Sequence, residues 1–328
     1  MCKFGDLICT MDNQFGFKSK HSTDMCIYAL KEAVEKYRGQ GSTMLVGFID
    51  ASKAFDRVNH HKLFTKLKHR GVPCSIIRIL AYWYDRQTMQ VKWGNILSSP
   101  FRVGNGVRQG GLLSPSLFSL YMDDLSRELR DCNTGCIIGN TLINHIMYAD
   151  DLAIISPSSA GFQQLLNICS DYGVKFDIKY NAKKSMVMIC RTKDDKHLNF
   201  PGLHLSGQTL SVCKSAKYLS HIINDKLEDD ADIGRQRRML YAQANVLVRR
   251  FHFCSDEVKV SLFRAYCTPM YTAPLWVRYK EESTRKLQVA YNDCLRILLK
   301  KPRGSSASKL FCNLRLTTFQ ATLRGLNV

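Results

Sequence analysis

Apolar residues along the chain recur in two spacings, one typical of helices and one typical of short buried strands. Residues 44–49 are all apolar or glycine and stop at Asp50, which predicts a buried strand. Residues 143–148 and 152–155 predict two more strands around a tight turn, and another strand is expected near 185–190. Other patterns predict helices over 23–39, 60–70, 73–86, 117–129 and 162–172, hairpins over 90–103 and 202–210, and mostly helix after Asp230.

This mixture of elements predicts an α+β fold. The 328 residues are 45% hydrophobic and 23% charged, which is typical of a globular protein with a packed core. We expect two parts with a soft boundary near Lys226, where an acidic segment precedes a basic helical region. No apolar run approaches the length of a membrane span and no signal sequence is visible, so neither is expected. Thirteen cysteines without a C-x-x-C pair indicate free thiols in a reducing, intracellular compartment.

The charge of the chain indicates the kind of partner that it binds. The formal net charge is +19, and the residues from Lys226 onward carry 19 basic and 9 acidic side chains. Such an excess is typical of proteins that bind a polyanion. Binding to an acidic membrane is the less favoured alternative, because no basic run lies on an amphipathic helix. We therefore expect a nucleic acid as partner, with the basic helical third contacting its phosphates.

Two of the predicted strands end at an aspartate. Asp50 and Asp150 are far apart in the chain, yet neighbouring strands of one sheet would bring both to the same edge. Mg²⁺ prefers carboxylate oxygens, and a pair of ions held there can activate a 3′-hydroxyl and stabilise a leaving pyrophosphate. Carboxylates at strand ends are also common in purely structural roles, so this pattern alone leaves both interpretations open.

Motifs around these aspartates carry a family resemblance. Residues 48–56 (FIDASKAFD), 106–115 (GVRQGGLLSP) and 148–151 (YADD) resemble, in the right order, three palm motifs of reverse transcriptases. Residues 14–17 (QFGF) and 181–185 (NAKKS) are similar to segments of the non-LTR, or LINE-type, retrotransposon polymerases.

The resemblance, which covers about residues 14–225, implies an RNA-directed DNA polymerase with a right-hand fold. An antiparallel palm sheet packed on helices, with partial fingers, would occupy residues 1–225. A basic, helical, thumb-like region would occupy residues 226–328. The implied substrates are an RNA template, a DNA primer and dNTPs, in the nucleus or the cytoplasm; the oligomeric state is not predicted.

The same resemblance implies roles for individual residues. Asp50 and Asp150 would be the principal ligands of two Mg²⁺ ions, for which Mn²⁺ could substitute, and Asp151 a weaker ligand. Lys184 would protonate the pyrophosphate or balance its charge. The incoming nucleotide would contact Ala51, Phe55, Gln109 and Gly110, with Phe55 excluding a 2′-hydroxyl, and Tyr218 and Leu219 would form the primer grip.

Some features of the sequence differ from the family pattern and leave other functions open. Only about a dozen residues precede Gln14, where the family has basic finger residues, and no endonuclease or zinc knuckle is recognised. A catalytically incompetent, truncated nucleic-acid-binding protein is therefore the alternative; an RNA-templated RNA polymerase is disfavoured by the motif residues Phe55 and Gln109.

Two further features of the sequence concern individual motifs. Ser220 replaces a glycine usual in the primer grip. Residues 121–124 (YMDD) repeat an active-site tetrapeptide, but helical spacing around them predicts that Asp123 and Asp124 diverge.

Overall fold

The computed structural model describes residues 9–192 and 202–326 and divides into two compact units, Met1–Lys214 and Ser215–Val328. Each unit has its own hydrophobic core. The cysteines within the described ranges are all free, in agreement with the prediction. No helix in the described part of the chain is long and apolar enough to span a bilayer.

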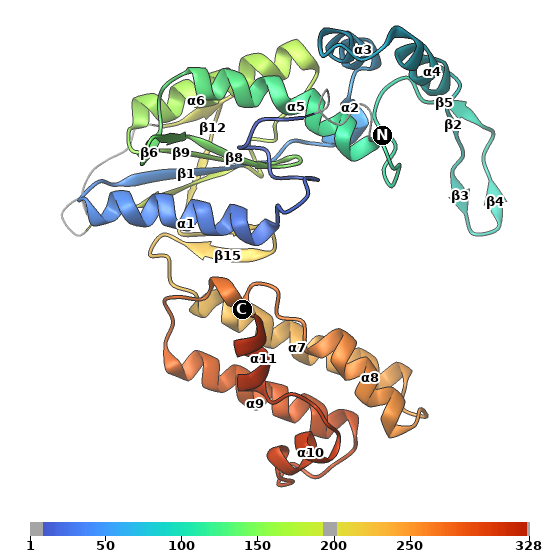
Figure 1. Ribbon diagram of the computed structural model, residues 1–328, viewed down its shortest axis with the longest axis vertical. Coiled ribbons are helices and arrows are strands. Elements are labelled where there is room, and N and C mark those ends of the chain that lie inside the picture. Colours follow the sequence, from blue (N-terminus) through green and yellow to red (C-terminus); the bar gives the residue numbers. More distant parts are fainter. Residues whose placement is uncertain (1–8, 193–201, 327–328) are drawn as a thin grey trace. The chain divides into compact units, whose positions relative to one another are not determined.

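A five-stranded sheet forms the centre of the first unit (Figure 1). Its strands are β1 (Met44–Ile49), β8 (His145–Tyr148), β9 (Asp151–Ser156), β10 (Met186–Cys190) and β13 (Ser211–Cys213). In the order β13-β10-β1-β9-β8, all neighbours are antiparallel except β13 and β10. Every residue of β1 is buried, which explains why this central strand is continuously apolar and does not alternate.

Helices cover both faces of the sheet: α1 (Thr23–Gly39) lies on one face, and α5 (Ser114–Asp131) and α6 (Ser159–Phe176) lie on the other (Figure 1). The Ser22 hydroxyl caps α1 by accepting from the Met25 amide. Gly47 lets α6 approach β1 closely, since a Cβ there would lie 2.6 Å from Cζ of Phe162. The predicted α+β class, an antiparallel sheet packed on helices, is confirmed.

One strand prediction was wrong. The run from Ile143 to Tyr148 is two strands, because β7 (Thr141–Ile143) pairs with β6 (Cys136–Ile138) before β8 begins at His145. Asn144 separates them: its buried side chain donates to the Leu129 carbonyl and contacts the His145 ring. A buried polar residue that bonds to helix α5 thus divides this run into two strands.

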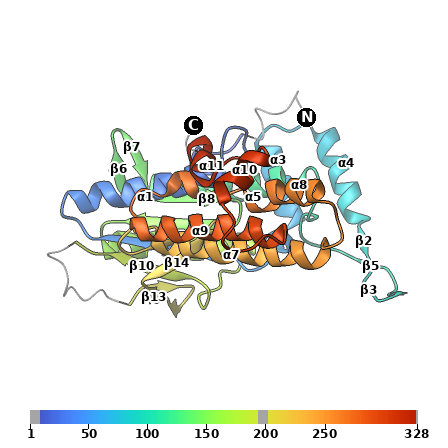
Figure 2. The same cartoon turned by 90° about the horizontal axis from the view of Figure 1, so that it is seen from below.

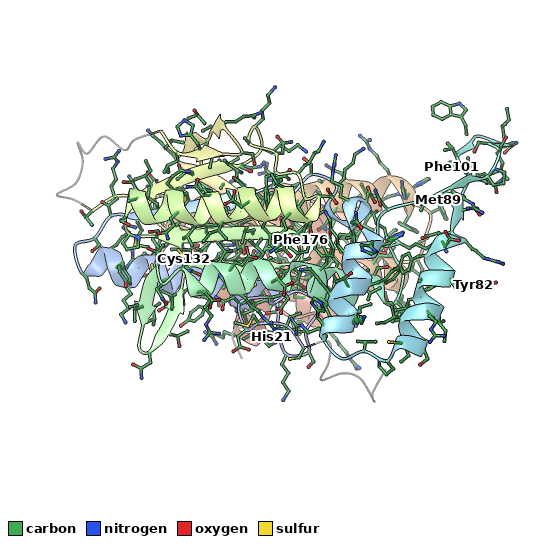
Figure 3. All side chains as sticks on the ribbon, turned by 90° about the horizontal axis from the view of Figure 1, so that it is seen from above. His21, Tyr82, Met89, Phe101, Cys132 and Phe176 are labelled. Carbon is green, nitrogen blue, oxygen red and sulfur yellow. The ribbon has the colours of Figure 1, made fainter. Side chains whose placement is uncertain are left out.

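Three shorter helices and an arm extend the first unit beyond the sheet. The helices are α2 (Ala54–Arg57), α3 (His60–His69) and α4 (Cys74–Asp85). The predicted hairpin after α4 is confirmed: β2 (Thr88–Met89) pairs with β5 (Phe101–Arg102), and β3 (Lys92–Trp93) pairs with β4 (Ile96–Leu97). Figure 3 shows this arm projecting from the unit, with Met89 and Phe101 exposed. The predicted hairpin near 202–210 is formed by β11 (His204–Leu205) and β12 (Gln208–Thr209).

The second unit is a helical bundle that begins with a hairpin. Its elements are β14 (Ser215–Tyr218), β15 (His221–Asn224), α7 (Asp230–Arg250), α8 (Asp256–Cys267), the 3₁₀ turn η2 (Ala273–Leu275), α9 (Glu281–Leu298), α10 (Ala307–Asn313) and α11 (Phe319–Leu326). Helices α7 and α9 run alongside each other (Figure 2). The predicted boundary near Lys226 assigned the hairpin to the first part. By packing it belongs to the second unit, because His221 is buried against Asp229 and Asp232 at the start of α7.

Candidate active site

The strand register brings the predicted acidic residues to one edge of the sheet. Ile49 at the end of β1 pairs with Leu152 of β9, so the next residues along, Asp50 and Asp151, lie beside each other. Asp150 occupies the tight turn between β8 and β9, whose closing pair is Tyr148 and Asp151. Two strands that are about 100 residues apart in sequence thus bring three aspartates to the same edge of the sheet.

The turn that carries Asp150 is held by the buried side chain of Gln14. Its Oε1 atom accepts from the amides of Ala149 (3.1 Å) and Gly16 (3.0 Å). Ala149 has φ of +58°, a conformation that costs a residue with a Cβ about 1 kcal/mol or more. Gly16 packs directly on the turn, because a Cβ there would lie 2.5 Å from the Ala149 nitrogen. The amide of Gln14 therefore stabilises a turn that is strained by itself.

Burial and the mutual repulsion of the carboxylates raise the pKa values of two aspartates at this edge. Burial, and then the charge of Asp50, raises the pKa of Asp150 above its ordinary value. Burial, and then the charges of Asp150 and Asp50, raises the pKa of Asp151 to about 6. Asp151 as a whole residue is still exposed to solvent, so its carboxylate is only partly buried and water reaches it. A cation bound here would relieve this repulsion.

The acidic edge fits Mg²⁺ as part of a substrate complex. Over residues 9–192 and 202–326, no three or more His, Cys, Asp or Glu side chains are gathered closely enough to hold a metal ion. Mg²⁺ in enzymes that act on nucleotides is held by one or two carboxylates together with water and substrate phosphates, so a complete protein cage is not required. The oxygen donors of Asp50, Asp150 and Asp151 match that mode of binding.

The backbone of Asp50 is held by the segment that follows α6. Its amide donates to the buried Ser185 hydroxyl (3.0 Å), and its carbonyl accepts from the Asn181 amide (2.9 Å). Asn181 also closes the following turn, since its carbonyl and side chain accept from the Lys184 amide. Lys184 is exposed on this turn, so the geometry fixes its backbone beside the acidic edge. The sequence motif 181–185 was noted for its resemblance, but the support that Ser185 provides was not predicted.

The motif aromatic Phe55 lies half-buried after β1. Its ring stacks on Phe118 of α5, with centroids 4.2 Å apart and planes inclined by 14°, and Phe17 lies edge-on at 6.4 Å. This packing fixes the orientation of the ring. Ala51 is buried and bridges to Tyr180.

The glycine-containing loop predicted to contact a nucleotide is open to solvent. Gln109 and Gly110 are exposed, and Gly110 has φ of +78°. Gly106, at the start of the loop, has φ of +92° and lies so close to Asp56 that a Cβ would be 2.9 Å from its Cα. Gln109 reaches Asp56 at 3.5 Å. Residues of this loop, among them Arg108, line a cleft of about 490 Å³ together with Trp83 and Gln87.

The predicted primer-grip residues lie in the second unit. Leu219 and Ser220 form the turn between β14 and β15, with φ of +46° and +68°. The position of Ser220 therefore does require positive φ, and the hairpin forms with serine there, closed by the pair Tyr218 and His221. Glycine would adopt this conformation at lower cost.

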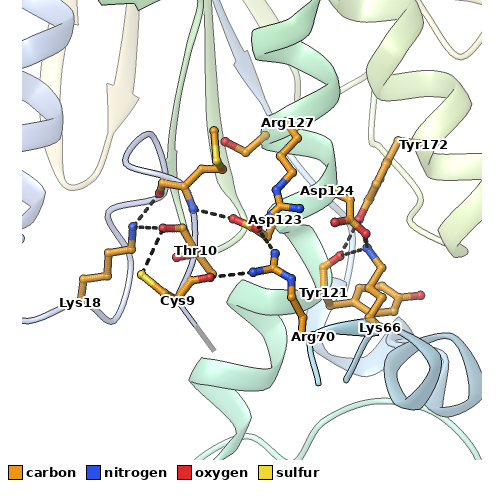
Figure 4. Close-up of polar contacts among 12 residues, drawn as sticks. Cys9, Thr10, Lys18, Lys66, Arg70, Tyr121, Asp123, Asp124, Arg127 and Tyr172 are labelled. Atoms are coloured by element: carbon orange, nitrogen blue, oxygen red, sulfur yellow. Dashed lines mark hydrogen bonds and ion pairs between the residues drawn. The ribbon is translucent and has the colours of Figure 1, made fainter. Parts of the chain in front are cut away.

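The second tetrapeptide, residues 121–124, is part of α5 and does not form a turn. Asp123 is fully buried and pairs with Arg70 and Arg127, whereas Asp124 pairs with Lys66 at 2.6 Å (Figure 4). The prediction that the two carboxylates diverge around a helix is confirmed.

Comparison of the sequence with known protein families shows which family this chain belongs to. Residues 7–223 match the family described as reverse transcriptase (RNA-dependent DNA polymerase), and the chain belongs to this family. The palm-like α+β fold of its first unit agrees with that membership.

Two relatives indicate which kind of reverse transcriptase this chain resembles. The RNA-directed DNA polymerase from mobile element jockey of Drosophila funebris is 26% identical over 318 residues, which is 92% of this chain and 33% of that protein. The Pol polyprotein from retrotransposable element R2DM of Drosophila melanogaster is 33% identical over 136 residues, 42% of this chain and 13% of that protein. The predicted resemblance to non-LTR retrotransposon polymerases is confirmed.

The chain spans about a third of the length of the jockey relative. Among solved structures, apo telomerase from Candida tropicalis is similar with a TM-score of 0.49 and 12% identity, over 89% of this chain and 46% of that one.

Proposed function

We propose that this chain forms the polymerase part of an RNA-directed DNA polymerase of a non-LTR retrotransposon. It extends the 3′-hydroxyl of a DNA primer with dNTPs on an RNA template. The observation that carries the proposal is the register of β1, β9 and β8, which gathers three carboxylates at one sheet edge in a member of the reverse transcriptase family. Nucleic acid as substrate implies that the protein acts in the nucleus or the cytoplasm.

Asp50, Asp150 and Asp151 would hold two Mg²⁺ ions, or Mn²⁺ in their place, together with the phosphates of the incoming nucleotide. When bound, the ions supply the positive charge that activates the primer hydroxyl and stabilises the leaving pyrophosphate. Asp50 presents its carboxylate from a backbone held on both sides by Ser185 and Asn181. Lys184, on the turn that Asn181 closes, balances the charge of the pyrophosphate or protonates it.

The residues around the acidic edge select and position the nucleotide. The Phe55 ring, fixed by its stack on Phe118, excludes a ribose 2′-hydroxyl and so favours dNTPs over NTPs. Ala51, two residues after the end of β1, would contact the nucleotide. Gln109 and Gly110 contact the nucleotide from the exposed loop, where positive φ at Gly110 lets the backbone approach closely.

Residues 1–225 would thus act as partial fingers and palm, and residues 226–328 as a thumb. Tyr218 and Leu219 would hold the primer strand from the turn of their hairpin. Basic side chains line a groove of about 600 Å³ between α7 and α9, which suits the phosphates of a nucleic acid. They are Arg237, Arg238, Arg285 and Lys286; the groove also contains Glu282, which pairs with Lys286.

Primer extension tests the proposal. The purified chain, given an RNA template, a DNA primer, dNTPs and Mg²⁺ or Mn²⁺, extends the primer; with NTPs in place of dNTPs it extends poorly. Asp150→Asn lowers extension by about 10²–10³-fold or more, because a charge at the reacting phosphate is lost. Asp124→Asn, a matched change in the tetrapeptide of α5, retains extension.

Extension that survives both Asp50→Asn and Asp150→Asn would refute the site. RNA binding without any extension by the wild-type chain would support the alternative of a catalytically incompetent binding protein. Preference for NTPs would indicate an RNA-templated RNA polymerase.

A further inference from the structure

The carboxylate of Asp123 is part of a cluster that the proposed reaction does not use. Asp123 lies on α5 and is fully buried, with Arg70 and Arg127 paired to its Oδ2 atom. Its Oδ1 atom accepts from the backbone amide of Met11 at 2.6 Å. Met11 is 112 residues away in sequence, so this bond joins α5 to a distant segment of the chain.

The segment that Asp123 holds is residues 11–16, here called the strap. Two cations, Arg70 and Lys18, hold its start and the two residues just before it (Figure 4). Arg70, already paired with Asp123, donates to the carbonyl of Cys9 (2.9 Å). The ammonium of Lys18 donates to the carbonyls of Thr10 (2.9 Å) and Met11 (2.6 Å). A buried carboxylate with charged hydrogen-bond partners is costly to remove, so the start of the strap has one well-defined position.

The other end of the strap lies against the turn that carries Asp150. Met147 donates to the carbonyl of Asn13 (2.9 Å) and accepts from the amide of Phe15 (2.8 Å). Gln14 accepts from the Ala149 amide, and Gly16 contacts the Ala149 backbone. The strap thus makes main-chain and side-chain bonds to the residues immediately before Asp150.

We propose that Asp123 is a positioning residue for the turn of residues 148–151, acting through the strap. This inference rests on the proposed function, because it concerns the same acidic edge. Asp123 fixes Met11, the strap carries that position to Gln14, and Gln14 holds Ala149 at its positive φ. Residues 121–124 of α5, which resemble an active-site motif, therefore stabilise the turn of residues 148–151 that carries Asp150.

Asp124 provides a matched control from the same tetrapeptide. Its carboxylate bonds to Lys66, which also donates to Tyr172 (2.8 Å) and to the Tyr121 carbonyl (2.8 Å). This cluster joins α3, α5 and α6, and within the described part of the chain its hydrogen bonds do not reach the strap. Asp124→Asn therefore removes a comparable charge without disturbing the route from Asp123 to the turn.

Amide hydrogen exchange of the full chain, without metal or substrate, measures the position of the turn directly. In Asp123→Ala, the peptide covering residues 145–152 exchanges about tenfold faster or more, because the bonds from Met147 and Ala149 to the strap open. The peptide around Tyr172 keeps its wild-type exchange. Asp124→Asn gives the opposite pattern. Equal acceleration of both peptides in Asp123→Ala would mean that Asp123 stabilises the fold in general, and would overturn the proposal.

Asp123→Asn covers the case in which Asp123→Ala fails to fold. Asparagine keeps an oxygen for the Met11 amide and loses only the charge facing Arg70 and Arg127. The same localised acceleration, smaller in size, is expected, because Arg70 loses its ion pair with Asp123 and then holds the Cys9 carbonyl beside the strap less firmly. Wild-type exchange at residues 145–152 would overturn the proposal.

A double-mutant cycle in primer extension supplies the second test. Asp123→Ala and Gln14→Met each lower kcat by about ten- to a hundredfold with little change in primer KM, because a displaced turn misplaces the reacting groups. The double variant has a kcat within about twofold of the worse single variant, since both changes release the same strap. Penalties that multiply would contradict a route through Gln14. A wild-type chain without extension would defeat the proposed function alone, because hydrogen exchange still decides the role of Asp123.

Discussion

Gly16→Ala is the substitution for which the structure gives the most specific expectation. An added Cβ would lie 2.5 Å from the nitrogen and 3.2 Å from the Cα of Ala149, both backbone atoms that have no rotamer to change. Ordinary van der Waals contact begins near 3.4 Å, so the turn must retreat by about 0.9 Å. Gly16 has ordinary negative φ, so alanine adds no backbone strain and the effect comes from this contact. A displacement of about 1 Å at reacting groups costs about a hundredfold in rate.

Primer extension at saturating dNTP, with metal concentration varied, is the assay. Gly16→Ala is expected to lower kcat by about a hundredfold while the chain remains folded by circular dichroism. Gly39→Ala is the matched control: Gly39 ends α1, has nothing within 4 Å of an added Cβ, and alanine there has wild-type kcat with slightly higher stability. A kcat for Gly16→Ala within about threefold of wild type would refute the inference that the strap sets the position of the turn.

Three further expectations concern stability. Burial, and then the charge of Arg130, lowers the pKa of His145 from 6.5 to about 3, so the unfolded chain binds a proton that the folded chain does not. Between pH 7 and 5 this histidine alone lowers the free energy of unfolding by about 2 kcal/mol, measured by urea unfolding as the difference in pH dependence between the wild type and His145→Asn; the same pH dependence in both would contradict it. Ser220→Gly relieves the cost of φ of +68° and raises the free energy of unfolding by about 0.5–1 kcal/mol, whereas Ser215→Gly in β14 lowers it; equal effects would contradict the argument. The raised pKa of Asp151, about 6, means that its ionisation above that pH disfavours the metal-free fold, so Mg²⁺ raises Tm more at pH 7.5 than at pH 5.5; a Tm gain that does not depend on pH would count against metal binding at this edge.

Much of the fold follows from local patterns. The strand that ends at Asp50 and the hairpin around Asp150 were predicted because each is a short apolar run bounded by polar residues. Asn144 was missed, since one polar residue in an apolar run gives no local sign that it bonds to a helix. The hairpin at Ser220 was assigned to the first part because its packing against α7 depends on His221, Asp229 and Asp232, which local patterns do not connect.

The candidate site divides in the same way. Paired strand ends and motif order indicated Asp50 and Asp150, and helical spacing excluded Asp123 and Asp124 as a turn. The support given by Gln14 was not predicted, because its partner Ala149 lies 135 residues away and the sequence shows no periodicity that joins them. Contacts of this kind come from tertiary packing, which overrides local propensity and is visible only once the chain is folded.

Iron-directed cleavage tests the central claim most directly, because it locates the bound metal without relying on activity. Fe²⁺ replaces Mg²⁺ in the intact chain, and ascorbate with peroxide then generates radicals that cut the backbone close to the ion. We expect two cuts, near Asp50 and near residues 148–151, that excess Mg²⁺ suppresses and Asp150→Asn removes. Cuts centred on residues 123–124, or no cut that Mg²⁺ suppresses, would contradict the assignment of the metal site to the edge of the sheet.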